Sequence, residues 1–268
     1  MKVYSKQKMK QTCFILCLFG MMFSTVARTA AQTRIIAHRG YWNCEGSAQN
    51  SLTALKKAQA AGVYGSEFDV LVTADGVPVV NHDDSIQGFC IETSDYLRLK
   101  ELKLKNGESF PTLEQYLKQG KALEGIRLIL EIKPHRRVVN EDRAVAAILN
   151  LVEKHGLEER VEYISFSLNV CKELIRRAPS ARVSYLRGEI CPADLKKLGF
   201  SGLDYPYTVF DKHPDWIEKA QALGLMVNVW TVNDPARIRS LTNQKVDFIT
   251  TDDPLTAKEI AAKRASQF

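Results

Sequence analysis

The sequence predicts an α/β fold, a single domain in which a closed barrel of eight parallel strands is surrounded by helices. Short apolar stretches alternate with amphipathic helical stretches along most of the chain, the pattern of a parallel sheet covered by helices. The chain has 268 residues, of which 45% are hydrophobic, and barrels of this length commonly form one domain.

Nine stretches are candidate strands, one more than a closed barrel of eight requires. They are residues 34–37, 66–72, 77–80, 127–132, 161–164, 182–186, 202–204, 226–230 and 247–249. A turn signal, Ala74-Asp75-Gly76, separates two of them, and we expect the barrel to be irregular at this tight link. A doubly wound open sheet is the competing fold. However, no candidate strand is followed by the Gly-x-Gly-x-x-Gly run of dinucleotide-binding sheets.

The candidate helices carry recognisable start and stop signals. We expect one helix at residues 51–61 with Asn50 or Ser51 as its cap, another after Thr112, and a long helix at residues 138–155 that ends at Gly156. Shorter helices are expected at residues 169–177, 193–198, 214–223 and 235–241. Residues 84–111 are expected to be irregular.

The first 31 residues have the features of a secretory signal peptide. Four lysines precede an apolar run from Cys13 to Phe23, and small residues follow at Ala27, Ala30 and Ala31. We therefore expect cleavage near residues 27–31, a mature domain at residues 32–268, and a periplasmic or extracellular location without stable membrane insertion. An uncleaved N-terminal anchor is the alternative.

The basic charge of the chain belongs mostly to this leader. The formal net charge is +6, and the leader holds five basic residues and no acidic one, so the remainder carries 32 basic and 31 acidic residues. We therefore expect no nucleic-acid partner. Four cysteines remain in the mature chain, namely Cys44, Cys90, Cys171 and Cys191. Their spacing fits no zinc or redox motif, and free thiols and a disulfide both stay open.

Four short motifs place polar side chains at the ends of candidate strands. They are Ile36-Ala37-His38-Arg39-Gly40, Glu67-Phe68-Asp69-Val70, Val80-Asn81-His82-Asp83 and Leu130-Glu131-Ile132-Lys133. Residues two apart on a strand point to the same face, so Glu67 projects with Asp69 and Glu131 with Lys133. In a parallel barrel these side chains converge at the C-terminal mouth, where barrel active sites lie.

The chemistry of these residues predicts a metal-assisted phosphodiesterase site. Three carboxylates in one space resist ionisation, and a hard dication such as Mg²⁺ or Ca²⁺ removes their repulsion. His38 and His82 suit proton transfer near neutral pH. Two cationic side chains, Arg39 and Lys133, suit the binding of an anion.

From Ile35 to Leu255, the chain resembles the glycerophosphodiester phosphodiesterase family. The resemblance also rests on four further motifs: Thr73-Ala74-Asp75-Gly76, Pro111-Thr112-Leu113-Glu114, Trp230-Thr231-Val232-Asn233 and Thr251-Asp252-Asp253-Pro254. It implies a distorted (β/α)8 TIM barrel and metal-dependent hydrolysis of a small-molecule glycerophosphodiester to glycerol 3-phosphate and an alcohol. It also implies one cation, Mg²⁺ or Ca²⁺, bound by Glu67, Asp69 and Glu131, with His38 and His82 as the acid/base pair and Arg39 and Lys133 on the phosphate.

One position departs from the family pattern. Gln49 stands where the family usually has a glutamate, which keeps the shape of the side chain but removes its charge; we expect it near the metal or the substrate. Trp230 ends an apolar strand and is interpreted either as core or as a platform for the glycerol carbons.

Three other functions remain open at this point. They are a phosphoinositide-type phospholipase C lyase, a lysophospholipase D, and a non-catalytic phosphodiester-binding protein on the same fold. The sequence names neither the head group nor the metal.

Overall fold

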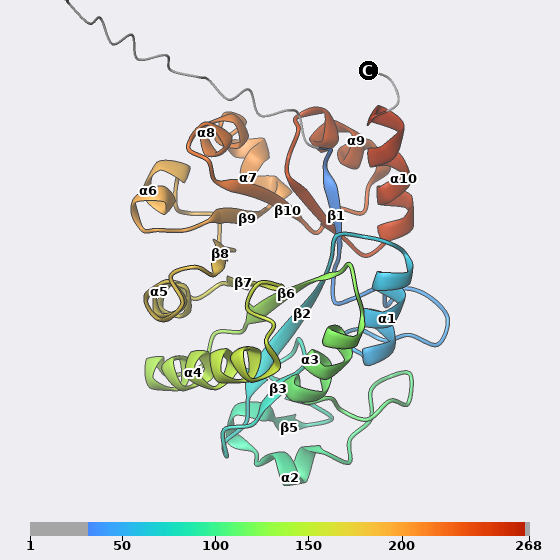
Figure 1. Cartoon of the computed structure of the whole chain (residues 1–268), viewed down its shortest axis with the longest axis vertical. Helices are drawn as coiled ribbons and strands as arrows, with labels where there is room; N and C mark the ends of the chain where they lie inside the picture. The colour runs from blue at the N-terminus through green and yellow to red at the C-terminus, as the bar shows by residue number, and fades with distance from the viewer. Residues whose placement is uncertain (1–31, 266–268) are drawn as a thin grey trace, which may run out of the picture. The chain divides into compact units, whose positions relative to one another are not determined.

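A computed structural model describes residues 32–265, and within this range nine strands form one sheet. Eight of them run parallel and close into a barrel, because β1 pairs with both β11 and β2 (Figure 1). The eight strands are β1 (Arg34–Ala37), β2 (Gly65–Val72), β6 (Arg127–Ile132), β7 (Val161–Ser165), β8 (Arg182–Tyr185), β9 (Gly202–Pro206), β10 (Met226–Trp230) and β11 (Phe248–Thr251). The predicted barrel is confirmed. The expected leader lies outside the described residues.

The ninth strand, β3 (Pro78–Val80), lies outside the barrel and pairs antiparallel with β2. Its link to β2 is a tight turn, in which the Thr73 hydroxyl and the Val77 amide are hydrogen-bonded. A parallel crossover needs a dozen or more residues, so this short link produces a hairpin. The extra strand and the irregularity therefore occur where the turn signal predicted them.

Residues 84–111 contain more regular structure than we expected. They form β4 (Ser85–Ile86), β5 (Phe89–Cys90), a 3₁₀ turn at Ile91–Thr93 and the short helix α2 (Tyr96–Leu99). The expectation of an irregular segment was wrong because these elements are too short to show periodicity. They are held by a small apolar cluster in which Ile91, Leu99 and Phe110 pack on Leu71 of β2 and Val79 of β3.

The helix boundary signals act as expected. Helix α1 (Leu52–Ala60) is capped by Ser51, and α3 (Leu113–Ala122) begins with a capping box between Thr112 and Gln115. Gly156 ends α4 (Val138–His155) in the left-handed conformation, at φ 64°. The remaining helices are α5 (Leu168–Arg177), α6 (Pro192–Lys197), α7 (Tyr207–Lys212), α8 (Trp216–Ala222), α9 (Pro235–Asn243) and α10 (Pro254–Ala265). Helices α7 and α10 were not among those predicted from the sequence.

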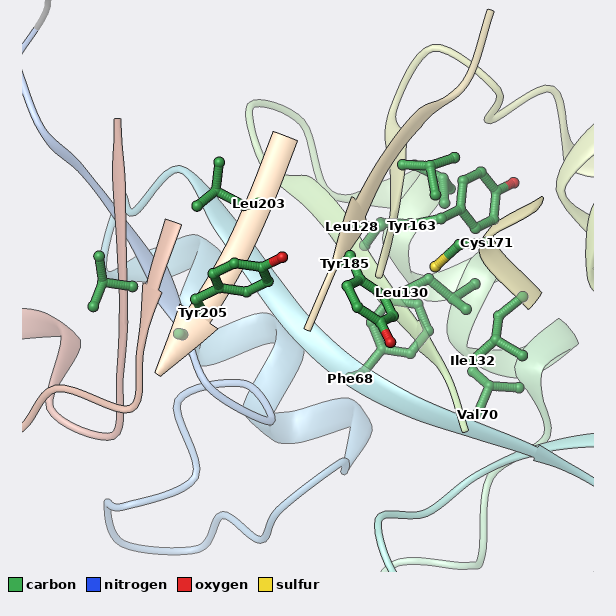
Figure 2. Packing of buried hydrophobic residues seen from close by; sticks show 14 of the residues in the cluster. Phe68, Val70, Leu128, Leu130, Ile132, Tyr163, Cys171, Tyr185, Leu203 and Tyr205 are labelled. Carbon is green, nitrogen blue, oxygen red and sulfur yellow. The ribbon is translucent and has the colours of Figure 1, made fainter. Parts of the chain in front are cut away.

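The strands separate two apolar layers. Outward-facing residues such as Phe68, Leu130 and Tyr205 belong to the large core between strands and helices (Figure 2). Inward-facing residues form a second cluster of Ile36, Ile129, Ile164, Leu186 and Phe248. This inner cluster fills the centre of the barrel, so a ligand can enter only at the mouth.

Membrane spans and disulfides were both considered from the sequence. No helix within residues 32–265 is long and apolar enough to cross a membrane. In the same range, Cys44, Cys90, Cys171 and Cys191 are all free thiols.

Candidate active site

Three buried carboxylates gather at the C-terminal ends of neighbouring strands β2 and β6. Glu67 and Asp69 come from β2, and Glu131 lies directly opposite Asp69 in the parallel register. One oxygen of each carboxylate lies within 4.8 Å of the others, and each residue is at most 7% exposed. The predicted metal ligands therefore do come together in space.

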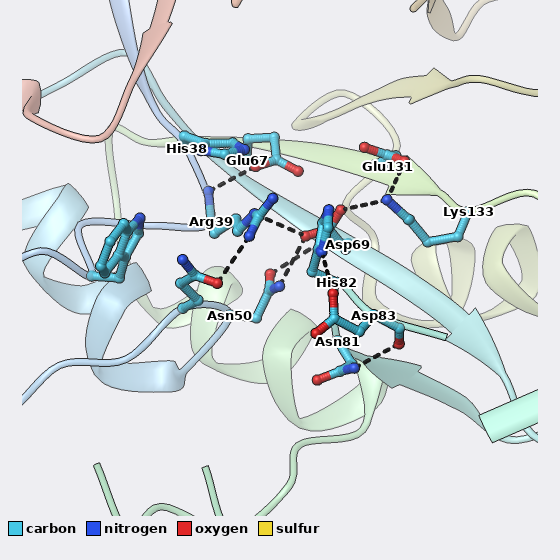
Figure 3. A network of polar contacts seen from close by, with 12 residues as sticks. His38, Arg39, Asn50, Glu67, Asp69, Asn81, His82, Asp83, Glu131 and Lys133 are labelled. Atoms are coloured by element: carbon cyan, nitrogen blue, oxygen red, sulfur yellow. Dashed lines mark hydrogen bonds and ion pairs between the residues drawn. The ribbon is translucent and has the colours of Figure 1, made fainter. Parts of the chain in front are cut away.

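Asp69 is held from two sides by neutral and cationic partners (Figure 3). The Asn50 amide donates to its Oδ2 at 2.9 Å, and Lys133 Nζ lies 3.3 Å from its Oδ1. Burial alone would raise the pKa of Asp69, but Lys133 and the Asn50 hydrogen bond outweigh it and hold this pKa below its usual range. Asp69 is thus ionised and fixed in orientation.

The other two carboxyl groups have raised pKa values, so each resists ionisation more than an exposed carboxyl group does. Burial, followed by the charges of Asp69 and Glu131, raises the pKa of Glu67 well above its ordinary value. Burial and the charge of Asp69 likewise raise the pKa of Glu131 to about 7. Its Oε1 lies 2.9 Å from Lys133 Nζ but is outside hydrogen-bonding geometry with any group of the described chain.

These observations fit a divalent cation. Three buried carboxyl groups whose oxygens lie close together are the kind of donor set that Mg²⁺ and Ca²⁺ prefer. Within residues 32–265 this is the only cluster of three or more such donors close enough together to hold a metal.

Arg39 adopts a left-handed backbone conformation, with φ 53°, at the end of β1. This turn directs its amide to Glu67 Oε2 at 2.7 Å and its Nη1 to Gln49 Oε1 at 2.9 Å. The next residue, Gly40, is required here, because a Cβ at its φ of 75° would lie 2.6 Å from Ala54 Cβ on α1. Arg39 Nε is buried, makes no hydrogen bond and lies 3.9 Å from Asp69 Oδ2, so the guanidinium faces the acidic cluster.

His38 lies at the mouth next to a polar network from β11. Its Nδ1 is 2.8 Å from Asp252 Oδ1, and Trp42 Nε1 donates to the same oxygen at 3.0 Å. Asn233 donates to the other oxygen of Asp252 at 2.7 Å. Although burial opposes it, hydrogen bonds from His38 and Asn233 lower the pKa of Asp252 to about 2. This carboxylate therefore orients the imidazole and leaves its Nε2 free.

His82 follows β3 on the opposite side of the site and is more open. Its Nδ1 lies 2.7 Å from Asp83 Oδ1, and its side chain is 37% exposed. Strand β3 runs antiparallel to β2, and the backbone amide of Asn81 donates to the carbonyl of Asp69. His82, the next residue, therefore lies at the mouth of the barrel. Both histidines thus pair with a carboxylate through Nδ1.

A single cavity of about 120 Å³ unites most of the predicted residues. It is lined by His38, Arg39, Glu67, Asp69, His82, Glu131, Lys133 and Trp230, together with Phe166, Asp204 and others. Trp230 packs edge-on against Phe166 at 5.6 Å between ring centroids. Trp230 therefore lines the cavity and is not part of the sealed core.

Gln49 is the predicted site residue that lies outside this cavity. It lines an adjoining groove of about 620 Å³ between the loop at residues 42–50 and the segment at residues 81–105. His82 lines both spaces and so marks their junction. The oxygen of Gln49 contacts Arg39 and is not part of the cluster of three carboxylates. The expectation that Gln49 lies near the substrate stays a prediction.

Two contacts at the site were not foreseen from the sequence. We treated Asn50 only as a candidate helix cap, whereas Ser51 caps α1 and Asn50 orients Asp69. We recognised Asp252 only as part of a motif, although it follows β11 just as His38 follows β1. Asp252 directly follows the C-terminal end of a barrel strand, and this position could have identified it as a site residue.

Comparisons with known proteins agree with this geometry. The glycerophosphoryl diester phosphodiesterase family model matches residues 38–256. A glycerophosphodiester phosphodiesterase of Caldanaerobacter subterraneus is 26% identical over 87% of this chain and 99% of its own length. The crystal structure of a glycerophosphodiester phosphodiesterase from Parabacteroides distasonis is 50% identical with a TM-score of 0.86, covering 87% of this chain and 98% of that one.

A third relative was solved with a ligand. The structure of an Oleispira antarctica phosphodiesterase in complex with the product sn-glycerol-3-phosphate is 25% identical with a TM-score of 0.77, covering 86% of this chain and 97% of that one. The family match covers most of the chain and includes the described cavity. The chain therefore belongs to the glycerophosphoryl diester phosphodiesterase family.

Proposed function

We propose that this protein hydrolyses a water-soluble glycerophosphodiester to glycerol 3-phosphate and an alcohol, using one divalent cation and two histidines. The observation that carries this proposal is the single cavity lined by three buried carboxyl groups, by the cationic side chains of Arg39 and Lys133, and by both histidines. The product bound to the Oleispira antarctica relative supports a glycerol phosphate at this position.

We propose Glu67, Asp69 and Glu131 as the residues that hold the cation, either Mg²⁺ or Ca²⁺. When bound, the cation would supply positive charge to a phosphate oxygen and to a neighbouring hydroxyl. Asp69 is ready to bind because it is already ionised, and the two other carboxyl groups would release protons on binding.

Arg39 and Lys133 are proposed to hold the phosphate. The guanidinium of Arg39 lines the cavity and could donate to a phosphate oxygen, and the Arg39–Gln49 hydrogen bond fixes its plane. Lys133 sits between Asp69 and Glu131. It therefore balances the acidic cluster and presents a point charge towards the same cavity.

His38 and His82 are proposed as the acid/base pair. Asp252 and Asp83 lie at Nδ1 of these rings, which leaves Nε2 of each ring to exchange a proton with substrate. His82 lies at the junction of the cavity and the groove, so we assign it to protonation of the leaving alcohol. His38 would then take the proton of the nucleophile, which is either the adjacent glycerol hydroxyl or water.

The groove beside His82 would take the leaving alcohol. Its lining mixes polar residues, such as Asn43, Ser85, Lys103 and Lys105, with apolar ones, such as Trp42, Ile86 and Leu104. The hydrogen bond between Asn106 and the Gly46 carbonyl joins its two walls. The charged and amide side chains of this lining could bind a hydrophilic head group.

The identity of the phosphorus product tests this function. ³¹P NMR of glycerophosphocholine turnover with Mg²⁺ or Ca²⁺ should show glycerol 3-phosphate as the final product, with choline released. Accumulation of a cyclic phosphate would instead support a lyase. Binding without turnover in either metal would support a binding protein, and turnover of lysophosphatidylcholine alone would support a lysophospholipase D.

A further inference from the structure

One buried carboxyl group of the catalytic cavity has no role in the proposed chemistry. Asp204 is in β9, where its neighbours Leu203 and Tyr205 belong to the outer core and Asp204 itself faces the barrel interior. It is 2% exposed and lines the cavity that also holds His38, Glu131 and Trp230. No family motif that we identified in the sequence includes it.

One oxygen of this carboxyl group lacks a partner. Asp204 Oδ1 is buried and makes no hydrogen bond within the described residues. Burial raises the pKa of Asp204 to about 7, and only the Asn228 amide, its register partner on β10, opposes this rise. Buried polar atoms in folded proteins nearly always have a partner, so an orphaned acceptor beside a ligand cavity points to the ligand.

The surroundings of Asp204 select a hydroxyl as that partner. The carboxyl group would repel a phosphate, and it is not among the three carboxylates placed to hold a metal. The uncharged residues that line the cavity include Thr250, whose hydroxyl accepts a hydrogen bond from the Asn228 amide. A neutral donor is therefore the chemistry that fits here.

The aromatic wall beside Asp204 fits the carbon chain of a polyol. Trp230 Nε1 donates to the backbone carbonyl of Asp204 at 2.8 Å, which ties the indole to β9. Phe166 packs on that indole and also lines the cavity. A three-carbon polyol could therefore lie against the rings with one hydroxyl towards the metal ligands and another towards Asp204.

We propose that Asp204 Oδ1 accepts a hydrogen bond from a hydroxyl of the substrate's glycerol. This contact would make the enzyme prefer diesters that contain glycerol over diesters with another alcohol in its place. This inference rests on the proposed function, because it assumes that a glycerol phosphate occupies the cavity. It assigns Asp204 a role in recognition and gives it no part in proton transfer.

The test compares two ligands that differ only in the glycerol. Binding of glycerol 3-phosphate and of inorganic phosphate is measured by calorimetry in the presence of Mg²⁺, using the wild type, Asp204→Ala and Asp204→Asn. We expect Asp204→Ala to weaken glycerol 3-phosphate binding about 10- to 100-fold and to leave phosphate binding within about twofold, the pattern of a lost specific hydrogen bond. Asp204→Asn, which keeps an acceptor oxygen, should lose less.

Thermal melting separates recognition from a structural role. An asparagine keeps a buried polar group but cannot ionise, so the melting temperature of Asp204→Asn without ligand at pH 8 should be at least that of the wild type. Thr242→Val is the matched control, since Thr242 Oγ1 is also buried without a partner but lies on α9, away from the cavity. This variant should bind both ligands as the wild type does.

Three results would overturn the inference. They are an equal loss of affinity for both ligands, unchanged glycerol 3-phosphate binding in Asp204→Ala, and a lowered melting temperature in Asp204→Asn. Failure of the proposed function is a separate result, because it would appear as a wild-type protein that releases no glycerol 3-phosphate from any glycerophosphodiester.

Discussion

Asn50 and Asp69 exchange two hydrogen bonds across the mouth of the barrel. The Asn50 amide donates to Asp69 Oδ2 at 2.9 Å, and the Asp69 backbone amide donates to Asn50 Oδ1 at 3.1 Å. Asn50 has a φ of 62°, a conformation that asparagine and glycine adopt more readily than other residues. One side chain thus fixes both the backbone and the carboxylate of a proposed metal ligand.

Asn50→Gly should remove this support while preserving the backbone conformation. Loss of a hydrogen-bonding partner of a metal ligand typically costs about 10- to 100-fold in metal affinity or activity. We expect losses of this size in Mg²⁺ or Ca²⁺ affinity by calorimetry and in kcat/KM. A variant with normal metal affinity and normal kcat/KM would show that Asn50 has no such role.

The His38–Asp252 pair predicts a graded series of variants. His38→Ala and His82→Ala should each lower kcat by about 10²- to 10⁴-fold, the usual contribution of positioned proton transfer. Asp252→Asn should lower kcat without a matching rise in KM, because an asparagine no longer selects the imidazole tautomer with a free Nε2. Steady-state kinetics with glycerophosphocholine measure both.

His213 offers a control for these histidine variants. It stacks on Trp216 with 4.1 Å between ring centroids and lies outside the catalytic cavity. His213→Ala should therefore retain wild-type kcat. Near-normal turnover in His38→Ala or His82→Ala would remove that residue from the proposed role.

The metal-free protein should become less stable as the pH rises. Glu131 has a pKa of about 7, above its ordinary value of 4.5, so the folded state favours the protonated form. The resulting stabilisation is fully present below about pH 4.5 and is lost as the pH rises through about 7. This shift corresponds to at most about 3 kcal/mol.

Chemical denaturation in EDTA between pH 5 and pH 8 tests this dependence. Glu131→Gln should reduce the slope of the profile, because a glutamine does not ionise; the slope that remains belongs to Asp204 and Glu67, whose pKa values are also raised. Metal affinity of the wild type should rise over the same pH range, since binding releases protons. A wild-type profile that is flat in EDTA, or that rises with pH, would contradict the assignment.

The groove beside His82 predicts a preference for anionic head groups. Among its charged residues, Asp83 is paired with His82, whereas Lys105 makes no ion pair within the described chain. Lys105→Ala should raise KM for glycerophosphoserine about 2- to 5-fold, the size of an exposed charge interaction, and leave KM for glycerophosphocholine unchanged. Lys196→Ala, which removes a lysine that does not line the groove, is the control. Equal changes for both substrates would argue against the groove as the head-group site.

The signal-peptide features of residues 1–31 predict that the protein is exported. Mass spectrometry of the purified native protein should find a mature N-terminus between residues 28 and 32, and fractionation should recover it outside the cytoplasm. An intact Met1 on a membrane-bound protein would support the uncleaved anchor.

Features that depend on neighbouring residues in the sequence were predicted, whereas very short elements were not. The strands of the barrel and the boundaries of α1, α3 and α4 were predictable because periodicity and caps are local signals. Glu67, Asp69 and Glu131 were predictable as a cluster because strand alternation and parallel register together determine their positions. The elements at residues 84–99 were missed because each spans only about one period of its pattern, too short for a repeat to show.

The contacts at the site that were missed join residues far apart in the sequence, so local patterns could not reveal them. The Asn50–Asp69 bonds join residues 19 apart, and the His38–Asp252 contact joins residues 214 apart across the closure of the barrel. The orphaned oxygen of Asp204 could be recognised only after its surroundings were known. The contact between Gln49 and Arg39 likewise could not be read from the sequence, although Gln49 was expected near the metal or the substrate.

Release of glycerol 3-phosphate by the purified protein tests the central claim most directly. The protein would be treated with EDTA, assayed with glycerophosphocholine and glycerophosphoglycerol, and then supplied with Mg²⁺ or Ca²⁺, beside an Asp69→Asn variant. We predict no release in EDTA, recovery on addition of metal, and little recovery in the variant. Equal release with and without metal would contradict the account, as would full recovery in Asp69→Asn.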